Sequence, residues 1–226
     1  MRRRPILCGL IFFVSILVLS GSNLLAQDDE ITLYNFDGRP VAYIAISEDY
    51  TIYLWNGKPV AYLYELSKKI HVYNFEGKHL GWFEDGIIID HNGNAVGFIN
   101  GALNVPTQFE PFKSFKQFKP LKGLRELPPL KPLFSGKWSL TPLQIFLLFG
   151  EAEPAMLLKD INNGDKIIIL RLNNEEAWLL EAKTWCRWSW KYEGEKIWII
   201  FGHSKTTVIN EDGDVCEFWT EKEIEY

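Results

Sequence analysis

The sequence lacks the motifs that mark most enzyme active sites. It contains no GxSxG elbow, no HExxH pair, no phosphate-binding glycine loop and no CxxC, so it shows no familiar nucleophile, zinc or nucleotide site. Serine is sparse after residue 26, and the four histidines, His71, His79, His91 and His203, are scattered without ligand spacing. We therefore expect no catalytic residue, no metal site and no cofactor.

Positive charge and cysteine are also scarce. The formal net charge is −5, which argues against a general nucleic-acid binder because such proteins are usually basic. The 226 residues include only three cysteines, whereas 47% of the residues are hydrophobic and 15% are aromatic. This composition excludes bulk disorder and provides enough apolar material for packed cores.

The first 26 residues have the pattern of a signal peptide. Arg2, Arg3 and Arg4 are followed by an apolar run, Ile6 to Leu19, and Ala26 offers a cleavage position before Gln27. We expect export to the periplasm or out of the cell, with an uncleaved membrane anchor as the alternative because Leu24 is large for its position. In that oxidising compartment Cys186 and Cys216 either form a disulfide or remain two buried thiols, and the sequence leaves both open.

One short unit occurs four times between residues 33 and 99. The copies read LYNFDGRPVAYI from Leu33, IYLWNGKPVAYL from Ile52, VYNFEGKHLGWF from Val72 and IIDHNGNAVGFI from Ile88. Each copy contains a turn pair that ends in glycine, at Gly38, Gly57, Gly77 and Gly93. Because a two-residue hairpin loop requires positive φ at such a position, each unit predicts a β-hairpin.

The returning strand of every unit carries a small residue followed by an aromatic one. The small residues are Ala42, Ala61, Gly81 and Gly97, and the aromatic residues are Tyr43, Tyr62, Trp82 and Phe98. A small residue at the same offset in each copy favours a close approach of the hairpins around a central axis. Two interpretations of the aromatic residues stay open, because they either pack a core or line a central cavity for an apolar ligand.

These units resemble the four-fold β-flower domain, a bacterial repeat fold of unknown function. The strings GKPVAYLY, GKHLGWFEDG and DHNGNAVGF carry the resemblance, which covers about residues 31–149. It implies an all-β fold in which four hairpins, within residues 31–104, are arranged radially, and in which residues 105–149 complete the same domain. The resemblance brings no site residues with it.

From residue 106 to residue 133, a segment that we call the ribbon, large apolar residues recur at every third position. This row, the apolar edge, comprises Phe109, Phe112, Phe115, Phe118, Leu121, Leu124, Leu127, Leu130 and Leu133. A second row, the basic edge, comprises Lys113, Lys116, Lys119, Lys122, Arg125 and Lys131. The period of three and the six prolines indicate polyproline II. We expect the apolar edge to be buried, because an exposed row is a liability; docking to a partner, or a basic strip for acidic polymers or lipid headgroups, is the alternative.

Two further elements follow the ribbon. Pro142, Leu143, Ile145, Phe146 and Phe149 predict a short apolar helix that seals one end of the flower. Residues 150–226 alternate strand signals with turns, which predicts a second small antiparallel β domain. Its many tryptophans indicate core packing or, alternatively, a platform for a flat ligand. With 16 acidic against 9 basic residues, this domain is expected to attract the basic edge.

The sequence therefore predicts an exported, non-enzymatic binding or interaction protein of unknown ligand. Candidate partners are a lipid or another apolar ligand and a protein of the cell envelope, and no nucleic acid is expected. A structural protein associated with the envelope is the first alternative. A hydrolase with an unrecognised site is the second, for which Asp90 with His91, or Glu84 with Asp85, would be the nearest acid/base pairs.

Overall fold

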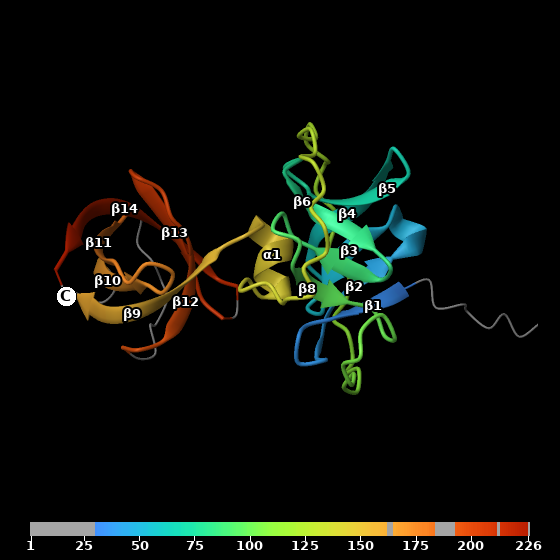
Figure 1. The fold of residues 1–226 in the computed structure, drawn as a ribbon, viewed down its shortest axis with the longest axis horizontal. Coiled ribbons are helices and arrows are strands. Elements are labelled where there is room, and N and C mark those ends of the chain that lie inside the picture. The colour runs from blue at the N-terminus through green and yellow to red at the C-terminus, as the bar shows by residue number, and fades with distance from the viewer. Residues whose placement is uncertain (1–29, 162–164, 184–192, 212, 226) are drawn as a thin grey trace, which may run out of the picture.

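The computed structural model describes residues 30–161, 165–183, 193–211 and 213–225. Within these residues the chain forms two closed antiparallel β-barrels with one α-helix between them (Figure 1). The predicted all-β architecture with a second β domain is thereby confirmed. The predicted signal peptide lies outside the described residues.

The first barrel contains the four hairpins. Its strands pair in chain order, and Tyr34 of the first strand pairs with Phe98 of the last to close the barrel. The strands are β1 (Glu30–Tyr34), β2 (Pro40–Ala45), β3 (Thr51–Leu54), β4 (Pro59–Leu66), β5 (Lys69–Asn74), β6 (His79–Glu84), β7 (Ile87–Ile89) and β8 (Ala95–Phe98). A single 3-10 turn, Ile46–Glu48, interrupts the link between β2 and β3.

The hairpin turns are longer than the predicted two residues. Each turn glycine donates its backbone N–H to the carbonyl oxygen three residues earlier, at 2.9–3.1 Å, and these acceptors are Asn35, Leu54, Asn74 and Asp90. A register shift accompanies every turn, which is the pattern of a three-residue loop with a glycine bulge. The predicted loop length is wrong, because the bulge adds a residue to one strand. The glycine requirement is confirmed, since all four glycines have φ between +71° and +94°.

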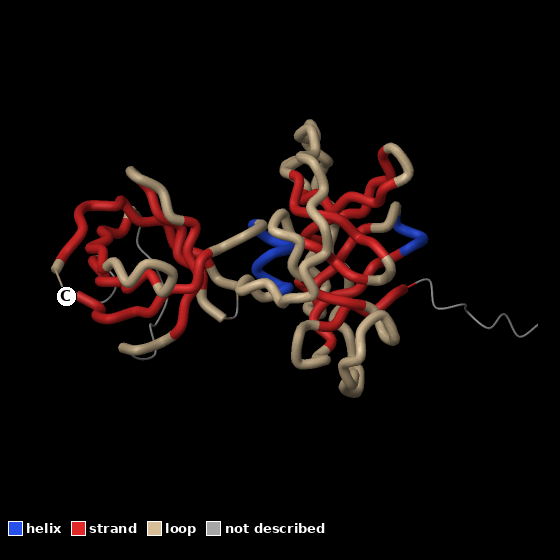
Figure 2. Tube along the Cα trace, viewed as in Figure 1, coloured by secondary structure: helices blue, strands red, loops and turns tan. Residues whose placement is uncertain are grey.

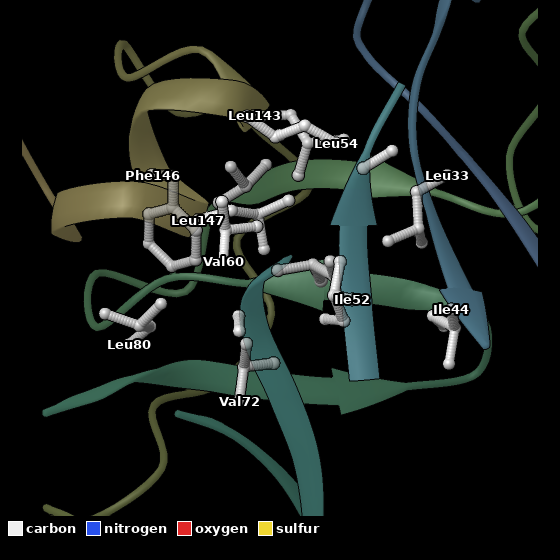
Figure 3. Close-up of a cluster of buried hydrophobic side chains, with 14 residues drawn as sticks. Leu33, Ile44, Ile52, Leu54, Val60, Val72, Leu80, Leu143, Phe146 and Leu147 are labelled. Carbon is white, nitrogen blue, oxygen red and sulfur yellow. The ribbon is translucent and has the colours of Figure 1, made fainter. Parts of the chain in front are cut away.

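The interior of the first barrel is aliphatic, and α1 (Leu143–Phe149) covers one end of it with apolar side chains that point inward. Figure 3 shows Leu143, Phe146 and Leu147 of the helix pointing toward Leu54, Val60 and other aliphatic side chains from the strands. The glycines among the small residues of the repeat allow α1 and a neighbouring hairpin to pack closely against the strands. A Cβ on Gly97 would lie 2.6 Å from the Leu143 side chain, and one on Gly81 would lie 2.1 Å from the carbonyl oxygen of Ile89. Within the described residues the centre of the flower is thus a packed core.

The second barrel has the strand order β10-β11-β14-β13-β12-β9. Its strands are β9 (Glu153–Ile161), β10 (Lys166–Arg171), β11 (Ala177–Ala182), β12 (Lys196–Ile200), β13 (Lys205–Ile209) and β14 (Val215–Ile224). Trp198 is buried, Trp178 is half-buried against Phe201, and Trp219 is exposed. Cys216 is buried on β14 and is disulfide-bonded. Cys186 lies outside the described residues, so its pairing with Cys216 stays a prediction.

The two barrels meet at α1 and at the residues on either side of it. Ile145 of α1 packs with Trp198 and Ile209 of the second barrel, and the Trp198 indole donates to the carbonyl oxygen of Leu140 at 3.1 Å. The hydroxyl of Thr141 accepts from the backbone N–H of Ala152 and donates to its carbonyl oxygen. Among the described residues, no helix is long and apolar enough to cross a bilayer.

Candidate functional site

The ribbon passes around the first barrel and meets each hairpin turn at an interval of nine residues. Figure 2 shows it as a tan tube that runs over and beyond the red strands. A Cβ on any turn glycine would lie only 2.0–2.2 Å from a ribbon carbonyl oxygen. The contacts are Gly38 with Pro106, Gly57 with Phe115, Gly77 with Leu124 and Gly93 with Leu133. Only glycine allows the ribbon to lie this close.

One edge of the ribbon provides backbone donors to the same turns. The carbonyl oxygens of Gly38, Gly57, Gly77 and Gly93 accept, in this order, the backbone N–H groups of Gln108, Gln117 and Glu126 of the ribbon and of Ser135 just after it, at 2.8–2.9 Å. These donors are again nine residues apart. Because polyproline II has three residues per turn, residues at a multiple of three share an edge. The same edge of the ribbon therefore donates to every hairpin turn.

The basic edge also faces the barrel, where it covers tyrosine rings. The Lys113 ammonium lies 4.6 Å from the ring centre of Tyr43, and the Lys122 ammonium lies 4.3 Å from that of Tyr62. Arg125 stacks over Tyr64 at 3.8 Å. A cation over an aromatic face is attracted by the ring quadrupole, so the basic edge holds the ribbon on the flower.

Carboxylates of the flower pair with the same basic edge. Lys116 contacts Glu30 at 2.8 Å and Glu48 at 2.9 Å, and Lys131 contacts Glu84 at 2.6 Å. Hydrogen bonds from the Tyr53 hydroxyl and then from Lys116 hold the pKa of Glu48 below its ordinary value. The expected attraction of the basic edge to the acidic C-terminal domain is wrong in these contacts, because acids of the flower itself lie nearer.

The apolar edge is left facing outward. All nine of its side chains are between 91% and 103% exposed, so the predicted burial of this edge is wrong. The reason is that the ribbon has three edges, and the backbone donors and the basic side chains already occupy the two that face the barrel. Nine large hydrophobic side chains are therefore exposed to solvent, on a ribbon whose backbone is hydrogen-bonded to the barrel.

The aromatic residues of the repeat lie on the outer wall of the barrel. Each of them is buried. Three pair with a residue of the next hairpin, and Phe98 pairs with the first strand, β1: the pairs are Tyr43 with Tyr53, Tyr62 with Tyr73, Trp82 with Ile89 and Phe98 with Tyr34. The rings of Tyr43 and Tyr53 stack at 5.6 Å. These residues do not line a central cavity, because the alternation of the strands points them away from the aliphatic core that the strands form with α1. They join neighbouring hairpins within the barrel wall.

Three histidines form a hydrogen-bonded row on the same wall. Nδ1 of His71 lies 3.0 Å from Nε2 of His79, and Nδ1 of His79 lies 2.9 Å from Nε2 of His91. At the outer end, Nδ1 of His91 is 3.4 Å from a carboxylate oxygen of Glu151. The expectation that these histidines are scattered is wrong, because β5, β6 and the turn after β7 bring them together. One signal was available in the sequence, since His71 shares a strand face with Tyr73, two positions away.

Burial favours the neutral form of the two inner imidazoles, because desolvation lowers the pKa of His71 and of His79 below the ordinary histidine value. At the outer end of the row, the Glu151 carboxylate faces His91. Hydrogen bonds from His91 hold the pKa of Glu151 below its ordinary value.

Comparison with known proteins decides the family. A family model described as 4-fold beta flower protein matches residues 31–147, which span the first barrel, the ribbon and most of α1. The chain belongs to the 4-fold beta flower family. No curated protein and no solved structure matches the chain, and the family match ends before the second barrel.

The histidine row of this beta flower domain offers no free base to a substrate. Both ring nitrogens of His79 and of His91 are engaged within the row. Glu151, at the end of the row, lines a cleft between the barrels together with Asp90 and Thr141 among others. The hydroxyl of Thr141 is hydrogen-bonded to the backbone of Ala152. Within the part of the chain that the structure describes, no group of three or more His, Cys, Asp or Glu could hold a metal. The row can hold or pass a proton, and it ties Glu151 to the flower.

We expect the beta flower barrel to lose stability as the pH falls from about 6.5 to 4. Burial, and then the charges of His91 and His71, lower the pKa of His79 to about 4, whereas an unfolded histidine has a pKa of about 6.5. The unfolded chain therefore binds more protons in this window. The free energy of unfolding decreases by up to about 3 kcal/mol from this group as the pH falls.

Urea unfolding at several pH values measures this dependence. Replacing His79 with asparagine should flatten the slope of stability against pH between 4 and 6.5. His203 is exposed on the second barrel, so His203→Asn serves as the matched control and should leave the slope unchanged. Equal slopes for His79→Asn and the unmodified protein would contradict the assignment.

Proposed function

We propose that this protein is an exported, non-enzymatic interaction protein that attaches to an apolar surface through the apolar edge of its ribbon. The exposure of all nine side chains of that edge, at 91% or more, carries the proposal. Soluble proteins rarely expose large contiguous apolar patches, and those that exist mark interaction sites. Burying one Leu or Phe side chain yields about 1.5–3 kcal/mol, so a partner that covers several of them would bind well.

The flower supplies the support that this function needs. Without anchoring, a proline-rich segment is a solvated chain that loses conformational entropy on binding. Here backbone hydrogen bonds at 2.8–2.9 Å and cation–π contacts hold the ribbon before any partner arrives. Pre-organisation of this kind lowers the entropic cost of binding. The aromatic residues of the repeat, Tyr43, Tyr62, Trp82 and Phe98, are buried in the barrel wall, and α1 packs into the barrel core. Both observations favour the outer surface over a central ligand cavity.

Partition into the detergent-rich phase of a clouded non-ionic detergent solution tests the proposal. The chain that starts at Gln27 contains every described residue and should enter the detergent phase. Replacing all nine residues of the apolar edge with serine should return it to the aqueous phase. Phe36→Ser with Leu140→Ser, at two exposed positions outside the ribbon, is the control and should partition as the unmodified chain does. Equal partition of the nine-serine variant and the unmodified chain would overturn the proposal.

A further inference from the structure

We infer that the occupant of the apolar edge is the surface of a lipid bilayer, and that the phenylalanine half of the edge makes the contact. This half comprises Phe109, Phe112, Phe115 and Phe118, and the leucine half comprises the remaining five residues of the edge. The inference rests on the proposed function and adds the nature of the partner and the part of the ribbon that meets it.

The first argument is the place where the chain enters the flower. Glu30, the first described residue, pairs with Lys113 at 2.9 Å and with Lys116 at 2.8 Å, and these lysines alternate along the ribbon with Phe112 and Phe115. The apolar run Ile6 to Leu19 ends ten residues before Glu30, and ten extended residues span at most about 35 Å. As long as the apolar run is attached, before cleavage or as an uncleaved anchor, the bilayer that receives it is within reach of the phenylalanine half.

The second argument is charge. Beside these four phenylalanines, the lysines of the basic edge turn inward to Glu30, Glu48 and the rings of Tyr43 and Tyr53. Among the described residues, no cation of this half is directed outward at an anionic partner, and the outward side is left apolar. Attraction to acidic lipid headgroups needs exposed basic groups, so the edge suits the neutral, apolar part of a bilayer. This favours insertion that depends little on salt or on anionic lipid.

The third argument is the depth to which a ribbon can insert. A polyproline II backbone forms no internal hydrogen bonds, and backbone groups without partners are costly in hydrocarbon. The backbone is thus expected to stay among the headgroups while the phenylalanine rings reach the boundary of the acyl chains, as in other interfacial segments. Successive rings are about 9 Å apart along the ribbon. Fluid acyl chains can fill such gaps, whereas a second protein surface would need matching projections.

Co-sedimentation with phosphatidylcholine vesicles tests the inference on the chain that starts at Gln27, which lacks the apolar run. Replacing the four phenylalanines with serine should lower the vesicle affinity at least about tenfold, which equals about 1.4 kcal/mol. The matched variant replaces Leu121, Leu124, Leu127 and Leu130 with serine and should lower it less than about threefold. Raising the salt concentration or adding phosphatidylglycerol should change the affinity of the unmodified chain little.

The remaining outcomes overturn the inference. Equal losses in the two variants, or binding only when anionic lipid is present, would contradict the phenylalanine half or the neutral contact. A phenylalanine-dependent dimer in sedimentation equilibrium without vesicle binding would identify a second copy of the chain as the occupant. The detergent partition experiment separates these cases from failure of the proposed function, because it reports an apolar docking surface whatever covers it. All the substituted side chains are more than 90% exposed, so the variants should fold.

Discussion

Replacing Phe146 with alanine is expected to lower the free energy of unfolding of the first barrel by about 3–5 kcal/mol. Phe146 is fully buried among the aliphatic side chains of the barrel interior (Figure 3). Its ring also lies against Gly81, where an added Cβ would be 3.3 Å away. Removing the ring leaves a cavity that eight hydrogen-bonded strands cannot easily close. A loss of this size is a large fraction of the stability of a typical domain.

Denaturant unfolding followed by hydrogen exchange should place the loss in β1 to β8 and spare β9 to β14. Phe112→Ala makes the same chemical change at a fully exposed position and should alter stability by less than about 0.5 kcal/mol. If Phe146→Ala costs no more than Phe112→Ala, α1 is not the core of the flower. Loss of protection that is equal in the two barrels would instead show that they unfold as one unit.

Replacing Gly77 with alanine is expected to release the ribbon from the third hairpin. Gly77 has φ of +94°, and alanine there costs about 1–2 kcal/mol from backbone conformation alone. In addition, the new Cβ would lie 2.0 Å from the carbonyl oxygen of Leu124, so the ribbon has to move away. Trypsin cleavage at Lys122 and Arg125, which flank this contact, should then become at least about tenfold faster.

Gly136 provides a matched control for this substitution. It also has positive φ, +70°, but nothing lies within 4 Å of the Cβ that alanine would add. Gly136→Ala should therefore show the conformational cost and leave the cleavage rate at Lys122 unchanged. Similar cleavage of the two variants would mean that the close contact between glycine and ribbon does not hold the ribbon in place.

The repeated units predict the first barrel well because their information is local. A glycine at each turn and alternation along each strand suffice to give four hairpins, and the helix is visible in its own apolar residues. The bulge in each turn was missed because a two-residue loop and a three-residue loop both place glycine at positive φ. The closed second barrel was foreseen only as a small β domain, since its strand order depends on pairings such as β9 with β12 that are distant in the chain.

The sequence predicts the ribbon itself, but it offers docking on the ribbon only as an alternative to burial of the apolar edge. The period of three identified the ribbon and its edges, yet the general rule that apolar side chains are buried put the wrong edge inside. Lys113 and Lys122 face the barrel because they contact tyrosine rings, and Lys113 also a carboxylate, on its outer wall. This wall forms only when the hairpins assemble, so a single sequence does not show it. The row of His71, His79 and His91 was missed for a similar reason, because it exists only once three hairpins are side by side.

The ribbon contacts one hairpin turn every nine residues, so the length of the ribbon is linked to the number of hairpins in the barrel. Each ribbon residue turns the next side chain by about 120°, so deleting one residue between Phe115 and Leu124 would rotate every later edge out of place. A deletion of three would restore the edges but would move Leu124 away from Gly77. Only a change of nine residues, matched by the gain or loss of a whole hairpin, preserves both the orientation of the edges and the contacts with the turn glycines. A relative with a different number of hairpins should therefore carry a ribbon that is longer or shorter by nine residues per hairpin.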